Sequence, residues 1–228
     1  MEINDEKVRN DASVVFDVIT SGGVAIVPLD VAYAIIGHTE YAIRKIFSVK
    51  KRSLDKPSGM FAAIDHSLAL HQLGELERQI QYSLINEHNL PFSVVAPFDN
   101  SHSLLRNVAP YVVDTSSKAG TLDMLLNAGR FHDALAKLCF KHNKPAFGSS
   151  ANVSLTGSKF KVADIEQELI EAADIVIDHG TSKYANPEGI SSTIIDFRDF
   201  TVIRHGCCYP ELKQIFHDRF AIELKLAS

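Results

Sequence analysis

The sequence predicts an α/β protein built on a mixed sheet flanked by helices. Short apolar runs rich in β-branched residues alternate along the chain with segments whose apolar residues recur at helical spacing. Such alternation is typical of α/β folds. Near the end, two strand-like runs at 192–197 and 200–204 are separated only by Arg198-Asp199, which predicts a hairpin and therefore antiparallel pairing within the sheet.

Helical periodicity is clear from the start of the chain. In residues 5–20, apolar side chains from Val8 to Ile19 form one stripe, and Gly22-Gly23 ends the helix. Thr39 can cap a second helix through its hydroxyl, and this helix runs into a basic cluster at 50–52. Further helices are predicted at 66–73, 75–88, 131–142, 162–172 and about 210–219.

Strands are predicted where short β-branched runs are bounded by turn residues. The run at 24–27 is stopped by Pro28, and the run at 92–96 lies between Pro91 and Pro97. Besides the late hairpin, the remaining predicted strands are 60–64, 111–113, 121–126 and 174–178. The stretch 148–152 is polar and is predicted to be a loop.

The composition is that of an ordinary globular domain. Hydrophobic residues make up 46% and charged residues 22% of the 228 positions, so we expect one domain over 1–228 with a substantial core. Three cysteines without Cys-x-x-Cys spacing and a polar N-terminus indicate a reduced, cytoplasmic setting. No apolar run approaches the ~20 residues of a membrane helix. The net charge of −5 argues against a global basic surface for nucleic acid.

Four polar constellations lie where predicted elements end, which is where α/β folds usually bind ligands. The first contains Asp30 and Tyr33 after the first strand, although a plain turn explains the same residues through local preference. The second contains Lys50 and Arg52. These cations suit a phosphate, and they equally suit a solvated helix C-terminus.

The other two constellations are rich in hydroxyl groups. Ser150 and Asn152 can hold a phosphate or carboxylate, or simply cap a helix. Ser192 begins the late hairpin and Arg204 ends it, positions that are more often plain surface. Although these residues are far apart in the sequence, we expect the basic, amide and hydroxyl groups to converge on one cleft.

The order of these constellations resembles that of the YrdC-like family, also known as threonylcarbamoyl-AMP synthases. Each motif is weak alone, but the ordered set spans roughly residues 10–206 and leaves 207–228 as a C-terminal helix and tail. The matching segments are Pro28 to Ala34, Lys50-Lys51-Arg52, Pro91-Phe92-Ser93, Ser150-Ala151-Asn152, Ser192-Thr193-Ile194-Ile195-Asp196 and Arg204-His205-Gly206. The resemblance implies a YrdC-like twisted mixed sheet flanked by helices, with a concave groove.

The resemblance also implies an activity. Members of the family convert ATP, bicarbonate and threonine to threonylcarbamoyl-adenylate and pyrophosphate, for tRNA threonylcarbamoyladenosine modification. Catalysis of this kind is mostly positioning and charge neutralisation, usually with Mg²⁺. The implied catalytic residues are Lys50, Arg52, Ser150 and Asn152, which also bind the nucleotide together with Ser192 and Arg204. Asp30 and Tyr33 would line the acceptor side.

Four positions depart from the family pattern. Leu29 stands in place of a threonine, Ala34 in place of a glycine, Leu125 in place of an arginine, and Gly148 in place of a serine. Replacing a hydroxyl and a guanidinium by leucines removes hydrogen-bond donors that could hold a carboxylate or phosphate. The nucleotide half of the site is therefore better preserved than the amino-acid half.

Two alternative functions follow from these departures. One is a diverged relative that binds a nucleotide or acyl-adenylate without activating threonine, or that uses another amine. The other is RNA binding through the same groove, which suits phosphates generally but is disfavoured by the acidic net charge. No metal site is expected, because the ten histidines show no pair at ligand spacing supported by cysteine or carboxylate.

Overall fold

The computed structural model describes residues 3–227, and within this range the strands form one twisted, mixed sheet of eleven strands. The order across the sheet is β11-β10-β9-β4-β6-β3-β7-β2-β1-β8, with β5 paired to β6 beside this path. The strands are β1 Ala25–Val27, β2 Ala34–Gly37, β3 Gly59–Phe61, β4 Phe92–Pro97, β5 Ser117–Lys118, β6 Thr121–Leu126, β7 Ala146–Ser150, β8 Ile175–Val176, β9 Ile194–Asp196, β10 Thr201–Arg204 and β11 Lys225–Leu226. The predicted α/β class, with helices flanking a mixed sheet, is confirmed.

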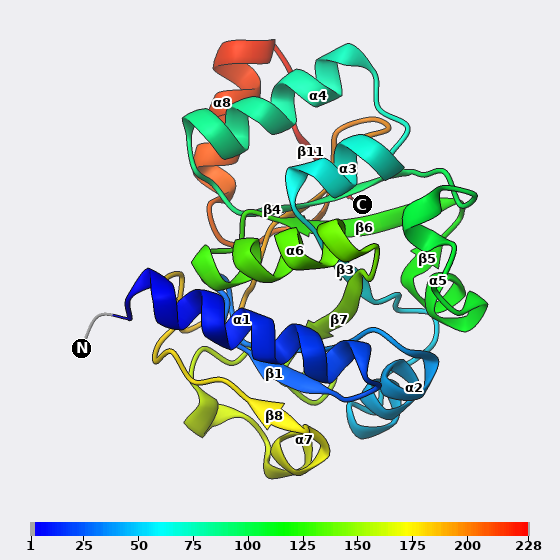
Figure 1. The fold of residues 1–228 in the computed structure, drawn as a ribbon. Helices are drawn as coiled ribbons and strands as arrows, with labels where there is room; N and C mark the ends of the chain where they lie inside the picture. Colours follow the sequence, from blue (N-terminus) through cyan, green and yellow to red (C-terminus); the bar gives the residue numbers. More distant parts are fainter. Residues whose placement is uncertain (1–2, 228) are drawn as a thin grey trace.

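Helices cover the sheet and its ends (Figure 1). In the view of Figure 1, α1 and α6 lie side by side in front of the sheet, whereas α4 and α8 lie beyond its β9–β11 end. The helices are α1 Asp5–Thr20, α2 Glu40–Val49, α3 Ile64–Leu70, α4 Glu75–Tyr82, α5 Pro110–Ser116, α6 Arg130–His142, α7 Gln167–Ala172 and α8 Tyr209–Phe220. A π-helical turn, η1 Ser83–Glu87, extends α4, and two 3-10 turns occur at η2 Ser103–Leu105 and η3 Val162–Asp164.

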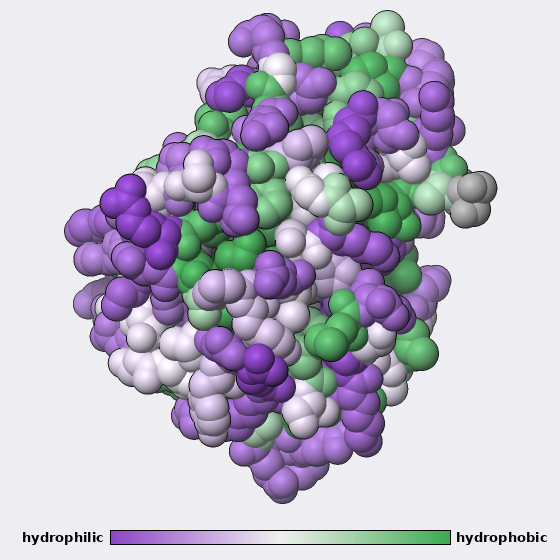
Figure 2. Space-filling model, turned by 90° about the vertical axis from the view of Figure 1, so that its right-hand side faces the viewer, coloured by the Kyte–Doolittle hydropathy of each residue, from purple (hydrophilic) through white to green (hydrophobic). Residues whose placement is uncertain are grey.

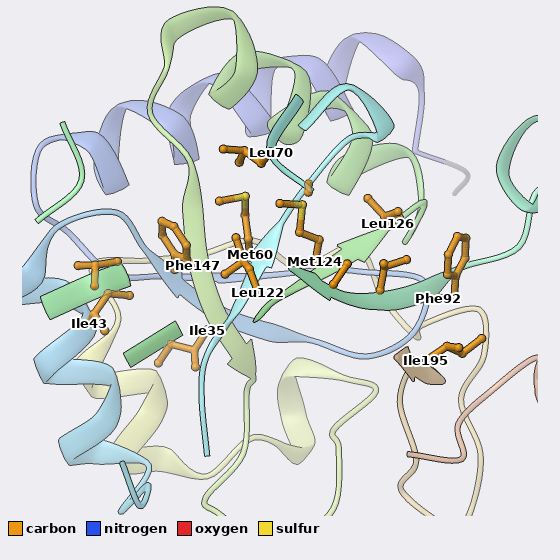
Figure 3. Close-up of a cluster of buried hydrophobic side chains, with 14 of the residues drawn as sticks. Ile35, Ile43, Met60, Leu70, Phe92, Leu122, Met124, Leu126, Phe147 and Ile195 are labelled. Atoms are coloured by element: carbon orange, nitrogen blue, oxygen red, sulfur yellow. The ribbon is translucent and has the colours of Figure 1, made fainter. Parts of the chain in front are cut away.

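Two apolar cores fill the spaces on either side of the sheet. The larger core joins α2 and α8 to the centre of the sheet, and Figure 3 shows Met60, Met124 and Phe147 converging there from neighbouring strands. The second core packs α1 and α6 against β1 and β2. On the face shown in Figure 2, hydrophilic residues cover most of the outline, and hydrophobic residues reach the surface in separate small areas.

Several sequence predictions are corrected by tertiary pairing. Residues 111–113 belong to helix α5, not to a strand, because Pro110 at its first turn presets a helical φ and Val112 and Val113 are buried on one face. Residues 148–150 belong to strand β7, not to a loop, since β2 pairs with all three and β3 pairs with Gly148 on the other side. Strand β2 was not predicted, because it is buried throughout and so shows no alternation. The predicted helix at 162–172 is a 3-10 turn followed by the shorter α7.

Gly148 lies where β7 passes unusually close to β2. A Cβ added at this position would stand 2.1 Å from the carbonyl oxygen of Ile35, which is backbone and cannot rotate away. The neighbouring strand offers a contrast: Gly59 pairs with Gly148, and its added Cβ would come no closer than 3.4 Å to any atom. The backbone of β2 therefore leaves no room for the serine side chain that the family has at position 148.

We predict that Gly148→Ala destabilises the fold by about 1–3 kcal/mol or more, because the strands must separate to admit the methyl group. Gly59→Ala is the matched control and should cost much less, since its methyl group would meet only an ordinary van der Waals contact. Urea unfolding of both variants measures the difference. Equal losses of stability would show that the close approach at Gly148 does not constrain the fold.

Candidate functional site: a basic cluster beside the ends of β7 and β10

Lys50 follows α2 and is 1% exposed, which is rare for a lysine. Its ammonium donates hydrogen bonds to the backbone carbonyls of Ser150 and Asn152, and its own carbonyl accepts one from the N–H of Ser154 at 3.0 Å. Burial next to Arg52 lowers the pKa of Lys50 to about 7. The two carbonyl oxygens act to raise the pKa of Lys50, because they accept hydrogen bonds from its ammonium form and stabilise it. Lys50 therefore fastens the end of α2 to the turn that follows β7.

The side chains of this turn are bonded to one another. The hydroxyl of Ser150 donates to Oδ1 of Asn152, and Nδ2 of Asn152 donates to the carbonyl of Val153 at 2.6 Å. The N–H of Ala151 donates to the carbonyl of Tyr33 at 2.8 Å, which ties the turn to the start of β2. The buried hydroxyl of Ser149 has no hydrogen-bond partner among the described residues. The turn is thus rigid and rich in polar groups.

Arg52 is held by the loop that follows it. Its Nε donates to the carbonyl of Lys56 at 2.9 Å and its Nη2 to the carbonyl of Pro57 at 2.6 Å. Partial burial, followed by the charge of Arg204, lowers the pKa of the Arg52 guanidinium, although an arginine stays charged at neutral pH. The guanidinium is therefore fixed in place near a second arginine.

Arg204 ends β10 and reaches back to the segment before β9. Its Nε and Nη2 donate to the carbonyl of Ser192 at 3.1 and 2.8 Å, and Nη2 also lies 3.1 Å from the Ser192 hydroxyl. That hydroxyl is 3.3 Å from the hydroxyl of Ser93 on β4. The close approach depends on Gly206, where an added Cβ would stand 2.3 Å from backbone atoms of Ser192 and Thr193.

Asp123 on β6 is a site residue that sequence reasoning missed. Burial raises its pKa to about 6, whereas the charges of Arg204 and Arg52 and the Ser93 hydroxyl act to lower it. Its Oδ1 atom is buried without a hydrogen-bond partner among the described residues. The sequence contains a sign of this acid, because Asp123 is the only charged residue in a strand otherwise composed of Thr, Leu and Met.

The predicted nucleotide-side residues therefore lie together. Hydrogen bonds join Lys50 to Ser150 and Asn152, and others join Arg204 to Ser192. Besides burial, the positive charge of Arg52 lowers the pKa of Lys50, and the positive charge of Arg204 lowers the pKa of Arg52, so the three cations are neighbours. These residues thus lie near one another, with the ammonium of Lys50 directed at backbone carbonyls, and their convergence on one cleft stays a prediction.

Asp30 and Tyr33 lie in a different place, around a cavity of about 360 Å³. Partial burial raises the pKa of Asp30, whereas the positive charge of Lys183 acts to lower it. The Tyr33 hydroxyl uses its hydrogen-bonding capacity within the protein. It lies 2.8 Å from the Gly180 carbonyl and 3.0 Å from Asp178 Oδ1, and it accepts a hydrogen bond from the N–H of His179 at 3.1 Å. Tyr33 thus anchors the 178–180 loop, while Asp30 faces the cavity.

The two leucines that depart from the family pattern belong to apolar packing. Leu29 is buried in the core beneath α1 and α6, and Leu125 packs partly against the same core. Leu29 also lines the cavity that contains Asp30. No group of three or more His, Cys, Asp or Glu residues within 3–227 is arranged to hold a metal ion. No helix in this range is both long and apolar enough to cross a membrane.

Comparison with known proteins places this geometry in context. The family model Sua5_yciO_yrdC, described as "Telomere recombination", matches residues 17–206. A protein of Methanocaldococcus jannaschii with the curated name "Putative threonylcarbamoyl-AMP synthase" is 26% identical over 209 residues, covering 89% of this chain and 87% of that protein.

Solved structures show the same fold. The crystal structure of P. abyssi Sua5 complexed with L-threonine has a TM-score of 0.74 at 19% identity. The match covers 100% of this chain but only 61% of that protein, so this chain spans less than two thirds of the length of that relative. E. coli YciO has a TM-score of 0.66 at 17% identity, with 87% and 90% of the two chains covered.

We predict that Lys50→Met lowers the free energy of unfolding by at least about 2 kcal/mol, because buried carbonyls at Ser150 and Asn152 lose their donor. Lys51→Met is the matched control, since the Lys51 side chain is 70% exposed and only approaches Glu168 at 3.4 Å. Chemical denaturation of the two variants gives the comparison. A Lys50→Met protein as stable as the wild type would mean that the buried ammonium does not hold the turn.

Proposed function

The chain belongs to the Sua5–YciO–YrdC family, and on this basis we propose that it is a threonylcarbamoyl-AMP synthase-like nucleotidyltransferase. The observation that carries the proposal is the meeting of Arg52, Arg204 and the Ser150–Asn152 turn, which come from three distant parts of the matched region. Two fixed guanidinium groups beside a turn of hydroxyl and amide groups suit the phosphates of a nucleotide.

The proposed reaction needs no protein nucleophile. An amino acid and bicarbonate condense to a carbamate with loss of water. A carbamate oxygen then attacks the α-phosphate of ATP, a P–O bond forms, and the bond to pyrophosphate breaks. Negative charge builds on the phosphate oxygens, and Arg52 and Arg204 are placed to neutralise it. Lys50 holds the turn, and the turn would keep Ser150 and Asn152 at hydrogen-bonding positions for those oxygens.

Mg²⁺ would reach this cluster bound to the phosphates of ATP. Magnesium commonly binds through one or two carboxylates together with substrate phosphates. Here the charges of Arg204 and Arg52 act on Asp123, and its Oδ1 is buried without a partner among the described residues, which leaves only its other oxygen for a dication. Binding through the nucleotide alone therefore fits the residues present better than a dedicated protein site.

The acceptor amino acid has a candidate pocket in the cavity beside Asp30. Asp30 and Lys183 place opposite charges on its wall, and Leu29 and Phe131 supply apolar surface. This combination suits a zwitterion with a small side chain. The loop that lines the cavity leads directly into β2, whose first residue pairs with Ser150. We therefore assign acceptor binding to Asp30, and give Tyr33 the role of holding the adjacent loop.

ATP binding should depend on Arg52. Arg52→Ala should weaken ATP binding by about 1.5–3 kcal/mol, the loss typical of a charge-assisted hydrogen bond. Lys51→Ala, at the adjacent exposed position, should change the affinity far less, because a solvated charge is screened. Isothermal titration calorimetry with Mg²⁺ present measures both. A wild-type protein that binds no ATP would refute the nucleotide assignment.

Selectivity among acceptor amino acids should be weak. Discrimination for a substrate hydroxyl is strong where the protein hydrogen-bonds it and weak in an apolar pocket. Because Leu29 replaces a threonine in the cavity wall, we expect less than about tenfold selectivity for threonine over valine. Pyrophosphate release with ATP and bicarbonate, measured across an amino-acid panel, gives the ratio. A threonine preference of two or more orders of magnitude would show that other residues recognise the hydroxyl.

A further inference from the structure

A carboxylate–imidazole pair lies at the cavity beside Asp30 and has no part in the proposed phosphate chemistry. Nε2 of His179 lies 2.7 Å from Oδ2 of Asp11, and the two side chains are only 12% and 17% exposed, so the pair is largely shielded from solvent. His179 lines the cavity together with Asp30 and Lys183. The pair therefore connects helix α1 to the loop after β8 that bounds the proposed acceptor pocket.

His179 is held on three sides. Its backbone N–H donates to the Tyr33 hydroxyl at 3.1 Å, and its Nε2 is held by Asp11. The imidazole meets the ring of Phe131 on α6 edge-on, with the centroids 5.7 Å apart and the planes at 86°. The remaining nitrogen, Nδ1, has no hydrogen-bond partner within residues 3–227, and it is not one of the fully enclosed polar atoms. Nδ1 is thus the polar atom of the ring that is left for a ligand.

The carboxylate of Asp11 decides which ring nitrogen carries the proton. Burial acts to raise the pKa of Asp11, but hydrogen bonds from His179 and Lys7 lower it overall, so the group is ionised at neutral pH. An ionised carboxylate only accepts hydrogen bonds, so Nε2 of the imidazole must be the donor. In a neutral imidazole the other nitrogen then carries the lone pair. Nδ1 is therefore oriented and poised as a proton acceptor.

Charged groups of both signs surround this pair. Lys7 lies 2.9 Å from Oδ2 of Asp11, and Arg130 on α6 is engaged by Asp5 and by the carbonyl of Ile3 at 3.2 Å. The remaining titratable groups near the cavity are Asp30, His132, Asp133, Asp178 and Lys183. Among the described residues, Asp11 alone lies within hydrogen-bonding distance of the imidazole nitrogens. This one contact therefore fixes the tautomer of His179.

We propose that Nδ1 of His179 is the base that removes a proton from the ammonium group of the acceptor amino acid, and that Asp11 is the positioning residue that keeps this nitrogen unprotonated. This role rests on the proposed function, because it requires an amino acid in the cavity beside Asp30. It deepens that function, since an ammonium group has no lone pair with which to attack bicarbonate.

The step needs no further reagent. The ammonium donates a proton to Nδ1, which leaves a neutral amine and an imidazolium. The amine nitrogen forms a bond to the carbon of bicarbonate, and a C–O bond of bicarbonate breaks. The departing hydroxide leaves as water with a second proton from the amine, and the product is the carbamate anion. The imidazolium then returns its proton to solvent.

Histidine suits this task better than the acid that lines the same cavity. A general base is most effective when its pKa is close to the working pH, and histidine is the side chain whose ordinary pKa meets that condition. The carboxylate of Asp30 would attract the ammonium group, and an opposite charge favours the protonated amine. Asp30 therefore binds the acceptor, and His179 removes its proton.

The first measurement is the steady-state rate of pyrophosphate release with Mg²⁺, ATP, bicarbonate and L-threonine at pH 7. We expect His179→Gln to lower kcat by about 100-fold or more, with the KM for threonine little changed. Asp11→Asn should also lower kcat, because an amide does not fix the tautomer. His217→Gln is the matched control and should match the wild type, since it removes a histidine that pairs with Asp218 at 2.6 Å on the surface of α8. A His179→Gln protein with the kcat of the wild type would overturn the proposal.

The pH dependence separates a base from a residue that only holds the loop. Amino groups lose their proton in solution as the pH rises toward their own pKa, so alkaline buffer supplies the neutral amine without the protein. The deficit of His179→Gln should therefore shrink between pH 7 and pH 9. A deficit of the same size at every pH would show that His179 has a structural role alone.

A measurement on the unmodified protein does not depend on turnover. Nitrogen-15 NMR of histidine rings distinguishes protonated from unprotonated nitrogen, and the spectrum of His179→Gln identifies the signals of His179. We expect an unprotonated Nδ1 at pH 8 and a shift of its signal when L-threonine is added. A protonated Nδ1, or a signal that threonine leaves unchanged, would contradict the assignment of the base.

The two proposals fail in different ways. If the wild type releases pyrophosphate but threonine leaves the Nδ1 signal unchanged, only the role of His179 is wrong. If the wild type releases no pyrophosphate but threonine shifts the signal, the contact between Nδ1 and an amino acid stands and the synthase is wrong. If neither effect is seen, both are wrong. Circular dichroism of each variant establishes that a loss of activity is not a loss of fold.

Discussion

A buried ammonium group holds together two of the segments that carry the basic cluster. Lys50 ends the first helix of the larger core, and its side chain reaches the carbonyls of Ser150 and Asn152 a hundred residues later. Desolvating a lysine is costly, so the arrangement persists only because its hydrogen bonds are satisfied. The position of the Ser150–Asn152 turn, and hence of every polar group on it, depends on this contact.

The charges of the basic cluster are arranged around that turn with little freedom. Arg52 is bonded to the carbonyls of its own loop, and Arg204 to the segment that contains Ser192. A guanidinium that is already bonded to backbone does not need to reorganise when an anion arrives, which is the condition for electrostatic stabilisation during phosphoryl chemistry. The basic cluster is thus preorganised.

The loop between β1 and β2 links the Ser150–Asn152 turn to the cavity that contains Asp30. One end of the loop is pinned by Tyr33, whose hydroxyl is bonded to the 178–180 segment, and the other end is pinned by the N–H of Asp30, which donates to Ala128 at 2.8 Å. A rigid connector of this kind holds the cavity beside Asp30 at a fixed separation from the Ser150–Asn152 turn. Proximity effects in catalysis require such fixed geometry.

The sequence by itself determined the elements with strong local periodicity, such as α1 and α6, and the ordered motifs that indicated the family and therefore the fold. Tertiary structure alone decided that 148–150 form a strand and that Tyr33 and Lys50 bond to distant backbone. It also decided that Oδ1 of Asp123 is buried without a hydrogen-bond partner among the described residues. The physical reason is that periodicity reports the repeat of one element along the chain. The partner of a buried polar group instead comes from wherever the sheet brings another segment, and no local pattern encodes that choice.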